Sequence, residues 1–271
     1  MYETAAALRQ KLASGTLIVG AHSFLTDSAI TELFGYHGFA FVWIDGEHCA
    51  FTLPVILQHI QAAASGGTAS LVRIAWNDPA LAKPVLEMGP DGIIFPYIRT
   101  AEEARRAMAA CFYPPKGVRG FGPRRANQYG FIENRQYLDQ VDNSFLRILQ
   151  IEHRDAVENL EEILQVPGID VVVVGPNDLS ASYGCLGNVR APAMQPVYDH
   201  IAEICKKNGM PFGVSLGCAD RDFVREWIQR GISLLGCGDD ITFMSIGSTQ
   251  TLEFIREIQT KEDEGGPANG Q

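Results

Sequence analysis

The chain has 271 residues, enough for one large α/β barrel of about 250 residues or for two small domains. With 46% hydrophobic and 20% charged residues it can bury a sizeable core, which excludes a disordered chain, a collagen-like chain and a small disulfide scaffold. Its 22 Lys and Arg residues against 32 Asp and Glu residues give a net charge of −10, the wrong sign for coating a phosphate backbone or an anionic membrane. We therefore expect neither a nucleic-acid partner nor a membrane partner.

The cysteines and the N-terminal segment indicate a cytoplasmic protein. The six cysteines form no C-x-x-C pair, and a chain of this length needs no disulfide staples, so we expect reduced and mostly buried thiols. The N-terminal segment carries Glu3, Arg9 and Lys11 among alanines and lacks the apolar stretch of a signal peptide. The longest apolar runs are strand-sized, below the roughly 18 residues of a membrane span.

In chain order, short β-rich runs alternate with segments of helical apolar spacing. We predict strands at residues 16–21, 40–44, 70–75, 92–96, 145–151, 170–174, 211–216 and 233–237. We predict helices at residues 27–35, 53–64, 101–112, 156–164, 192–207 and 220–230. Eight alternations predict an α/β protein with a single (β/α)8 TIM barrel over residues 1–259, followed by a disordered acidic tail at 260–271.

An open doubly wound sheet is the alternative fold, but its usual G-x-G-x-x-G signature is missing after the first predicted strand.

An extended loop at residues 97–144 joins the fourth and fifth strands, and loops of this length tend to contribute to a site or an interface. It carries four cations that suit either an anion site or acidic residues of another subunit: Lys116, Arg119, Arg124 and Arg125. Neither a P-loop nor a G-x-S-x-G elbow occurs, which disfavours nucleotide chemistry and serine hydrolysis.

Polar residues gather at the carboxyl ends of the predicted strands, where barrel enzymes carry their reactive groups. Asp45, Glu47 and His48 follow the second predicted strand, and Arg73 lies in the third. Gln150 and Glu152 close the fifth strand, and Asp178 follows the sixth. We expect these side chains to meet at one mouth of the barrel.

Glu152 and Asp178 are the candidate metal ligands. Strand alternation places Gln150 and Glu152 on the same face, and a carboxylate in a barrel centre is costly unless it is paired or coordinated. Two carboxylates on neighbouring strands suit Mg²⁺ or Mn²⁺. The alternatives are an N-cap for Asp178 and a salt bridge from Glu152 to Arg147 or Arg154.

Arg73 and His48 are the candidate catalytic groups. A guanidinium inside a barrel needs an anion, which is either a developing enolate oxygen or a structural acid such as Glu47 or Asp45. His48 stands beside an acid-rich strand end and suits proton transfer near neutral pH, and the alternative for it is an exposed loop histidine. His22 ends the first strand and faces either the mouth or the core, whereas the remaining four histidines are interpreted as structural.

These motifs, in this order, resemble those of the HpcH/HpaI aldolase family, the class II pyruvate aldolases, from about residue 4 to residue 258. The matching segments are WIDGEH at 43–48, VR at 72–73 with WNDP at 76–79, YPP at 113–115 with GVRG at 117–120, QIE at 150–152 and GPNDLS at 175–180. The resemblance implies a divalent-metal-dependent aldehyde-lyase that reversibly cleaves 4-hydroxy-2-oxo acids, such as 4-hydroxy-2-oxoheptanedioate or 2-dehydro-3-deoxyglucarate, to pyruvate or a related 2-oxo acid and an aldehyde.

The same resemblance implies a role for each site residue. Glu152 and Asp178 would hold Mg²⁺, Mn²⁺ or Co²⁺, while Gln150 and the amides of Asn177 and Asp178 would contact the 2-oxo acid. Arg73 would stabilise the enolate. His48 would act as acid and base, and Asp45 would hold a metal-bound water.

Glu87 is assigned by resemblance to the group that raises the basicity of the catalytic histidine. Because it precedes the fourth strand, it should lie at the opposite end of the barrel from His48. We hypothesise that it reaches His48 of a neighbouring subunit in a hexamer built as a trimer of dimers. The chain has Glu87 where relatives commonly carry Asp. It also has His22 in place of Trp and Asn177 in place of Ala or Ser, and these two departures bear on the aldehyde pocket.

Three functional hypotheses follow. The first is aldol cleavage, and the second is another metal-enolate lyase or a decarboxylase of the same superfamily. The third is a non-catalytic barrel that binds a carboxylate ligand. A Schiff-base aldolase is disfavoured because none of the predicted strands contains a lysine.

Overall fold

The computed structural model describes residues 2–218 and 220–264 and confirms the predicted (β/α)8 barrel. Neighbouring strands are parallel and pair in sequence order, and the last strand closes on the first. The strands are β1 (Ile18–Ser23), β2 (Phe41–Asp45), β3 (Ala69–Arg73), β4 (Gly92–Phe95), β5 (Leu146–Ile151), β6 (Val171–Val174), β7 (Phe212–Leu216) and β8 (Leu234–Asp239). Each lies within two residues of its predicted bounds.

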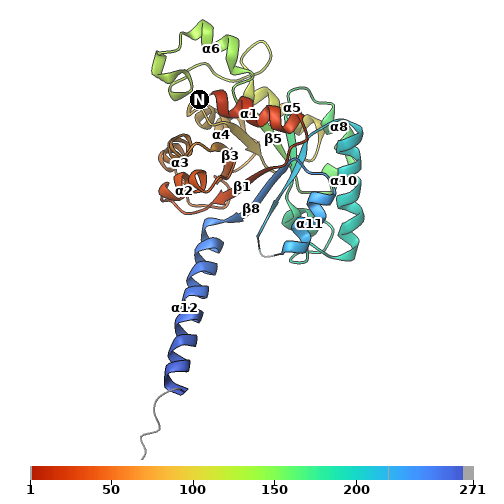
Figure 1. Ribbon diagram of the computed structural model, residues 1–271. Coiled ribbons are helices and arrows are strands. Elements are labelled where there is room, and N and C mark those ends of the chain that lie inside the picture. The colour runs from red at the N-terminus through yellow and green to blue at the C-terminus, as the bar shows by residue number, and fades with distance from the viewer. Residues whose placement is uncertain (1, 219, 265–271) are drawn as a thin grey trace, which may run out of the picture.

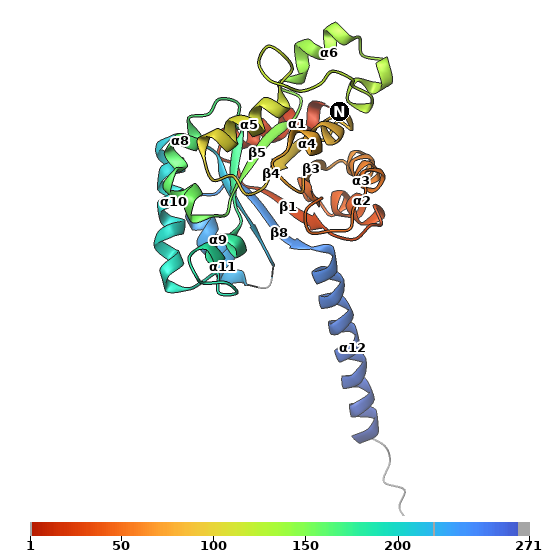
Figure 2. The ribbon, with the colours of Figure 1, turned by 180° about the vertical axis from the view of Figure 1, so that it is seen from behind.

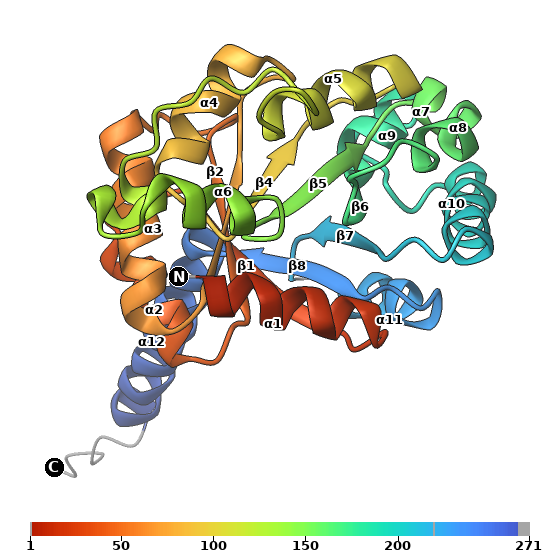
Figure 3. The same ribbon diagram turned by 90° about the horizontal axis from the view of Figure 1, so that it is seen from above.

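Helices surround the barrel (Figures 1 and 3). Those of the first half are α1 (Tyr2–Ala13), α2 (Ala29–Tyr36), α3 (Leu53–Gly66), α4 (Pro79–Glu87), α5 (Ala101–Cys111) and α6 (Asn134–Val141), with the 3-10 helix η1 (Arg125–Gly130). Those of the second half are α7 (Arg154–Glu158), α8 (Leu160–Leu164), α9 (Pro176–Ser182), α10 (Gln195–Lys207), α11 (Arg221–Gln229) and α12 (Asp240–Glu264), with η2 (Pro192–Met194). No helix in the described part of the chain has the length and apolarity needed to cross a membrane.

The core has two layers because strand side chains alternate in direction. Val171 and Val173 pack inside the barrel, whereas Val172 and Val174 pack against the surrounding helices. The inner layer also takes in Leu8 and Leu12 of α1, which runs across the end of the barrel where the strands begin (Figure 3). Because α1 covers this end, a site can form at the opposite end, where the strands finish.

Local sequence signals set the start of the helices that follow the strands. Asp78 caps α4 by accepting a hydrogen bond from the amide of Ala80 at 2.8 Å, and Pro79 occupies the first turn. Thr100 caps α5 in the same way, through the amide of Glu103 at 3.2 Å. The helix predicted at 156–164 is instead two short helices, broken at Asn159, whose side chain donates to the carbonyl of Arg99 at 3.0 Å.

Helix α12 differs from the other helices because it points away from the barrel (Figures 1 and 2). It carries large apolar side chains that are 41–60% exposed, namely Ile241, Met244, Ile246, Leu252, Phe254, Ile255 and Ile258. It runs to Glu264, so residues 260–264 of the predicted disordered tail are helical, and residues 265–271 lie outside the described residues.

The extended connection between β4 and β5 contains helices α5 and α6 and the 3-10 helix η1. Its cations bind groups of the chain itself. Lys116 pairs with Asp142 at 2.6 Å, and Arg125 donates to the carbonyl of Met88 at 2.8 Å. None of its described residues lines the cavity at the barrel mouth, so an anion site made by this connection alone is not observed.

Candidate active site

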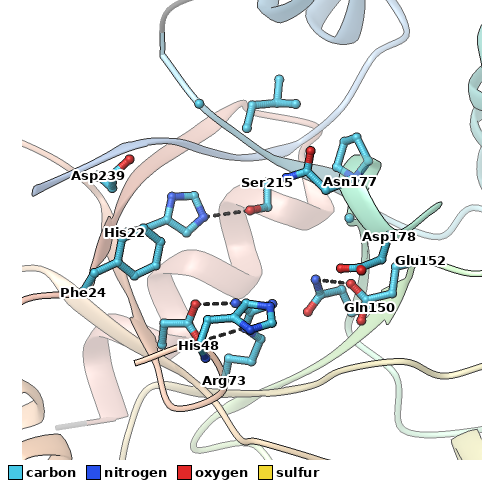
Figure 4. Close-up of a pocket in the computed structure, with 15 residues that line it drawn as sticks. His22, Phe24, His48, Arg73, Gln150, Glu152, Asn177, Asp178, Ser215 and Asp239 are labelled. Atoms are coloured by element: carbon cyan, nitrogen blue, oxygen red, sulfur yellow. Dashed lines mark hydrogen bonds and ion pairs between the residues drawn. The ribbon is translucent and has the colours of Figure 1, made fainter. Parts of the chain in front are cut away.

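A cavity of about 310 Å³ opens at the carboxyl ends of the strands (Figure 4). Apart from Glu47 and Glu87, every residue predicted for the site lines it: Asp45, His48, Arg73, Gln150, Glu152, Asn177 and Asp178. The lining also includes His22, Phe24, Gly175, Pro176, Ser215, Leu216, Gly217 and Asp239. The structure therefore brings together side chains that are far apart in the sequence.

Asp45 and Arg73 form a buried ion pair across β2 and β3, where they are register partners. Arg73 Nε donates to Asp45 Oδ1 at 3.1 Å, and its Nη2 binds the second carboxylate oxygen. Burial alone would raise the pKa of Asp45, but the guanidinium and the backbone amides of Glu47 and His48 outweigh it and hold that pKa below its ordinary value.

Arg73 also lies 2.9 Å from Glu47, in an ion pair that lacks the alignment of a hydrogen bond, and its guanidinium stacks 5.5 Å from the ring centre of Trp43. The structural pairing considered from the sequence is therefore present. A guanidinium has five N–H donors in a fixed plane. The two contacts of Asp45 use one edge of it, which leaves donors for an oxygen in the cavity.

Glu152 is a buried carboxylate that has no cationic partner among the described residues. Its side chain accepts hydrogen bonds from the amide of Tyr97 at 2.7 Å and from Gln150 Nε2 at 2.6 Å. Burial raises the pKa of Glu152 to about 8, with the charges of Glu47 and Asp178 acting in the same direction and the amide of Tyr97 and the charge of Arg73 acting against it. Such an arrangement is costly for the ionised form and favours a bound cation.

The salt bridge considered for Glu152 is not formed. Arg147 pairs instead with Asp170 at 3.1 Å, and the guanidinium of Arg154 stacks 5.3 Å from the ring centre of Tyr183. The structural alternative for the glutamate is therefore absent.

Asp178 lies in the first turn of α9, but it is not the N-cap, a position held by Gly175. Its side chain is exposed toward the cavity, next to Glu152 (Figure 4). A Cβ at Gly175, directly after β6, would lie 2.5 Å from Glu152 Oε2, so the absence of a side chain there lets the chain pass this close to the glutamate. The two carboxylates thus meet at the ends of adjacent strands.

His48 is exposed at the rim of the cavity. Its backbone amide donates to Asp45 Oδ1 at 3.2 Å, which fixes the loop after β2. Its imidazole makes no hydrogen bond with the described residues.

Glu87 ends α4 and so lies at the end of the barrel where the strands begin, as predicted. It pairs with the buried Arg119 at 3.3 Å, and its Oε2 atom is buried without a hydrogen-bond partner in the described structure. Burial raises its pKa, although Arg119 acts in the opposite direction. Within one subunit, therefore, Glu87 does not reach His48.

Ser215 and Asp239 had no role predicted from the sequence, and His22 was left open between the mouth and the core. His22 Nδ1 lies 2.8 Å from the carbonyl oxygen of Gly238, and its Nε2 lies 2.8 Å from Ser215 Oγ. Ser215 and Asp239 stand at the carboxyl ends of β7 and β8. The same strand-end rule that identified Glu152 could have identified both of them.

The fold and the site together define a barrel enzyme whose mouth combines two carboxylates that form no ion pair with a described residue, a buried arginine and a histidine. Residues 20–243 match the family model described as HpcH/HpaI aldolase/citrate lyase. The chain belongs to this family.

The similarity extends along most of the chain. The 2-dehydro-3,6-dideoxy-6-sulfogluconate aldolase of Pseudomonas putida is 34% identical over 255 residues, which cover 94% of this chain and 96% of that one. The 4-hydroxy-2-oxo-heptane-1,7-dioate aldolase of Salmonella dublin is 34% identical, with 89% and 91% covered. A crystal structure of an HpcH/HpaI aldolase/citrate lyase family protein from Burkholderia cenocepacia J2315 superposes with a TM-score of 0.87 at 27% identity, covering 92% of this chain and 99% of that one. The chain is accordingly an enzyme with aldehyde-lyase activity.

Proposed function

We propose that this enzyme is a divalent-metal-dependent aldolase that reversibly cleaves 4-hydroxy-2-oxo acids to pyruvate, or a related 2-oxo acid, and an aldehyde. One observation carries the proposal. The unpaired carboxylates of Glu152 and Asp178 face the same cavity as the Arg73–Asp45 pair and His48. A cation site next to an oxyanion-stabilising group is what cleavage beside a keto group requires.

The donor set fits a hard divalent cation. Glu152 and Asp178 offer carboxylate oxygens, and the buried Oε1 atom of Gln150 has no hydrogen-bond partner among the described residues. The described residues contain no cluster of three or more His, Cys, Asp and Glu side chains that could hold a metal, so thiolate or multi-histidine sites fit poorly. Mg²⁺, Mn²⁺ and Co²⁺ accept two carboxylates and leave positions for substrate oxygens. Once bound, such a cation would supply positive charge beside the keto oxygen of a 2-oxo acid.

The protein's own groups divide the remaining chemistry. His48 takes the proton of the 4-hydroxyl group, the C3–C4 bond breaks, and its electron pair moves toward the keto oxygen at C2. The aldehyde leaves, and the proton that His48 has taken is returned to C3, directly or through water, which gives the 2-oxo acid and restores the neutral histidine. Arg73 stabilises the negative charge on the keto oxygen, and Asp45 holds the guanidinium in place. The assignment of Asp45 to a bound water stays a prediction.

Gln150 and the backbone amides of Asn177 and Asp178 would orient the 2-oxo acid. All three residues line the cavity on the side of β5 and β6. Amides in the first turn of a helix point toward the helix start and suit a carboxylate group.

We also propose that the enzyme is a homo-oligomer. The exposed apolar side chains of α12 need a partner, and a mostly apolar groove of about 490 Å³ lies at the base of the same helix. Its lining consists of Ile30, Leu33, Phe34, Phe39, Phe243 and Met244 together with His37 and Asp240. Exchange of α12 between two copies would bury both surfaces. A hexamer built from such dimers could bring Glu87 to His48 of a neighbouring subunit.

A coupled assay tests the reaction. Candidate 4-hydroxy-2-oxo acids are incubated with the enzyme and Mn²⁺, and released pyruvate is followed with lactate dehydrogenase. Turnover that stops on chelation and returns with Mg²⁺, Mn²⁺ or Co²⁺ supports the proposal. Release of CO₂ without aldehyde would instead identify a decarboxylase. Unchanged turnover in His48→Ala and Arg73→Ala, with metal and pyruvate still bound, would rule out the assigned catalysis.

A further inference from the structure

The cavity wall formed by β1, β7 and β8 carries a hydrogen-bonded pair that no step above uses. His22 is 6% exposed, and its Nε2 atom lies 2.8 Å from the hydroxyl oxygen of Ser215. Figure 4 places this pair across the cavity from Glu152 and Asp178. It therefore faces the space next to, rather than within, the proposed 2-oxo acid site.

The pair has a defined hydrogen-bond direction. A carbonyl oxygen only accepts, so His22 Nδ1 carries the proton that bonds to the Gly238 carbonyl at 2.8 Å. Burial is the main cause that lowers the pKa of His22, so the ring is neutral at pH 7 and its Nε2 is an acceptor. The Ser215 hydroxyl must then donate to Nε2. Its oxygen lone pairs are left to accept a hydrogen bond from the cavity.

The backbone of β8 is shaped around the ring. A Cβ at Gly236 would lie 2.9 Å from His22 Cε1, so a larger residue there would displace the imidazole. Gly238 has a φ of +78°, which other residues adopt rarely, and it supplies the carbonyl that fixes the tautomer. Two glycines of one strand thus hold His22 in the orientation that Ser215 needs.

The surroundings of the pair disfavour an anionic group. The cavity continues past Ser215 into a pocket of about 190 Å³ that reaches Val189, Asp220 and Phe223. Among the described residues that line the two spaces, Arg73 is the only Lys or Arg, and it pairs with two acids. A substrate carboxylate placed here would therefore meet no Lys or Arg other than this paired one, whereas a substrate hydroxyl group would find an acceptor in the Ser215 oxygen.

We propose that Ser215, held by His22, accepts a hydrogen bond from a hydroxyl group on the aldehyde half of the substrate, which makes neutral hydroxyaldehydes the preferred acceptors. This inference rests on the proposed function. Ser215 is a specificity-determining residue that touches the aldehyde, and His22 is a positioning residue that acts through it.

The test compares glycolaldehyde with acetaldehyde, which lacks the hydroxyl group, in the aldol addition to pyruvate with Mn²⁺. The ratio of the two kcat/KM values is measured for the parent enzyme, Ser215→Ala, Ser215→Thr and His22→Phe. A second readout, exchange of the pyruvate methyl protons in D₂O without aldehyde, reports the 2-oxo acid half-reaction alone.

We expect Ser215→Ala and His22→Phe to lower the glycolaldehyde preference about 5- to 10-fold, the loss of one hydrogen bond. Methyl exchange should stay within twofold of the parent rate in Ser215→Ala, and Ser215→Thr should restore the preference. Succinic semialdehyde, which carries a carboxylate, should give a lower kcat/KM than glycolaldehyde.

The outcomes separate this inference from the proposed function. An unchanged ratio in Ser215→Ala with normal exchange would overturn the inference and leave the aldolase standing. Loss of exchange in Ser215→Ala would place the serine at the 2-oxo acid and overturn it too. A kcat/KM for succinic semialdehyde equal to or above that for glycolaldehyde would refute the neutral acceptor. Absence of exchange in the parent enzyme with Mn²⁺ would overturn both proposals.

Discussion

The backbone amide of Tyr97 donates a 2.7 Å hydrogen bond to Glu152 Oε1, and Tyr97 adopts a left-handed conformation, with a φ of +57°, in making it. A non-glycine residue in this region costs about 1 kcal/mol or more. The aromatic ring offsets part of that cost by stacking on Trp76, with the ring centres 5.7 Å apart. The loop after β4 therefore accepts strain at the point where it contacts a proposed metal ligand.

This strain predicts an inverted order of stability for two substitutions. Tyr97→Gly and Tyr97→Ala both lose the stacked ring, but only glycine relieves the left-handed backbone. We expect Tyr97→Gly to be more stable than Tyr97→Ala by about 1 kcal/mol in chemical denaturation. An alanine variant as stable as the glycine variant would show that the backbone at this position is not strained.

Glu152→Gln should separate activity from stability. The amide removes a carboxylate from the proposed cation site, so we expect at least a 100-fold loss of metal-dependent turnover and a weaker Mn²⁺ affinity. The same change removes a buried charge that has no cationic partner. In chelator-treated protein at pH 9, the variant should therefore be at least as stable as the parent.

Unfolding by urea and Mn²⁺ titration by calorimetry measure the two effects in Glu152→Gln. Gln150→Glu is the matched comparison, because it adds a charge at the neighbouring inward position of β5. It should lower the stability of the metal-free protein. If metal-free Glu152→Gln were less stable than the metal-free parent, the proposal that Glu152 serves to bind a cation would be contradicted.

Arg73→Lys should lower kcat about 100-fold while the fold is retained, because a lysine cannot reproduce the two-point contact with Asp45 and still reach the keto oxygen. Asp45→Asn should also lower kcat, since it loosens the guanidinium. The double variant should lose less than the product of the two single losses, because both act on one unit. Fully multiplicative losses would mean that Asp45 acts independently of Arg73.

His22 predicts a pH dependence of stability. Its pKa in the folded protein lies below 6.5, so the unfolded chain binds this proton more readily and low pH favours unfolding. The stability of the parent relative to His22→Gln should fall as the pH drops below 6.5, with a slope of up to about 1.4 kcal/mol per pH unit until the folded-state pKa is reached. Denaturation curves from pH 7.5 to 5 measure it. A constant difference over this range would contradict the neutral buried ring.

The apolar surface of α12 predicts that assembly depends on this helix. Phe254→Glu combined with Ile255→Glu should shift the protein to a smaller species in light scattering, because charges would replace side chains that are 60% and 43% exposed. Glu257→Gln, on the same helix, is the control and should leave the assembly intact. An unchanged molar mass in the double variant would remove α12 from the interface.

Part of this structure could be predicted from sequence for physical reasons. The strand predicted at 170–174 contains four consecutive valines, so both of its faces are apolar, and these valines divide between the two core layers. Alternation also placed Gln150 and Glu152 together. In a parallel barrel the carboxyl ends of all strands lie at the same mouth, so residues from four strands could be predicted to meet there.

Other features depend on partners that a sequence does not reveal. The ion pair of Arg73 with both Asp45 and Glu47 was one of two open alternatives, because nothing in the local pattern separates a structural acid from a substrate. The position of Ser215 at a strand end could have been predicted, but its hydrogen bond with His22, which lies on a different strand, could not. Whether α12 packs on the barrel or points away from it depends on which surface its apolar side chains cover. The composition of the helix does not specify that surface.

The central claim is that Glu152 and Asp178 hold a divalent cation, and anomalous diffraction from crystals soaked in Mn²⁺ tests it most directly. The account predicts an anomalous peak between the two carboxylates, and no peak there in crystals of Glu152→Gln. Saturating Mn²⁺ that produces no density at this position, or density bound elsewhere while turnover remains metal-dependent, would contradict it.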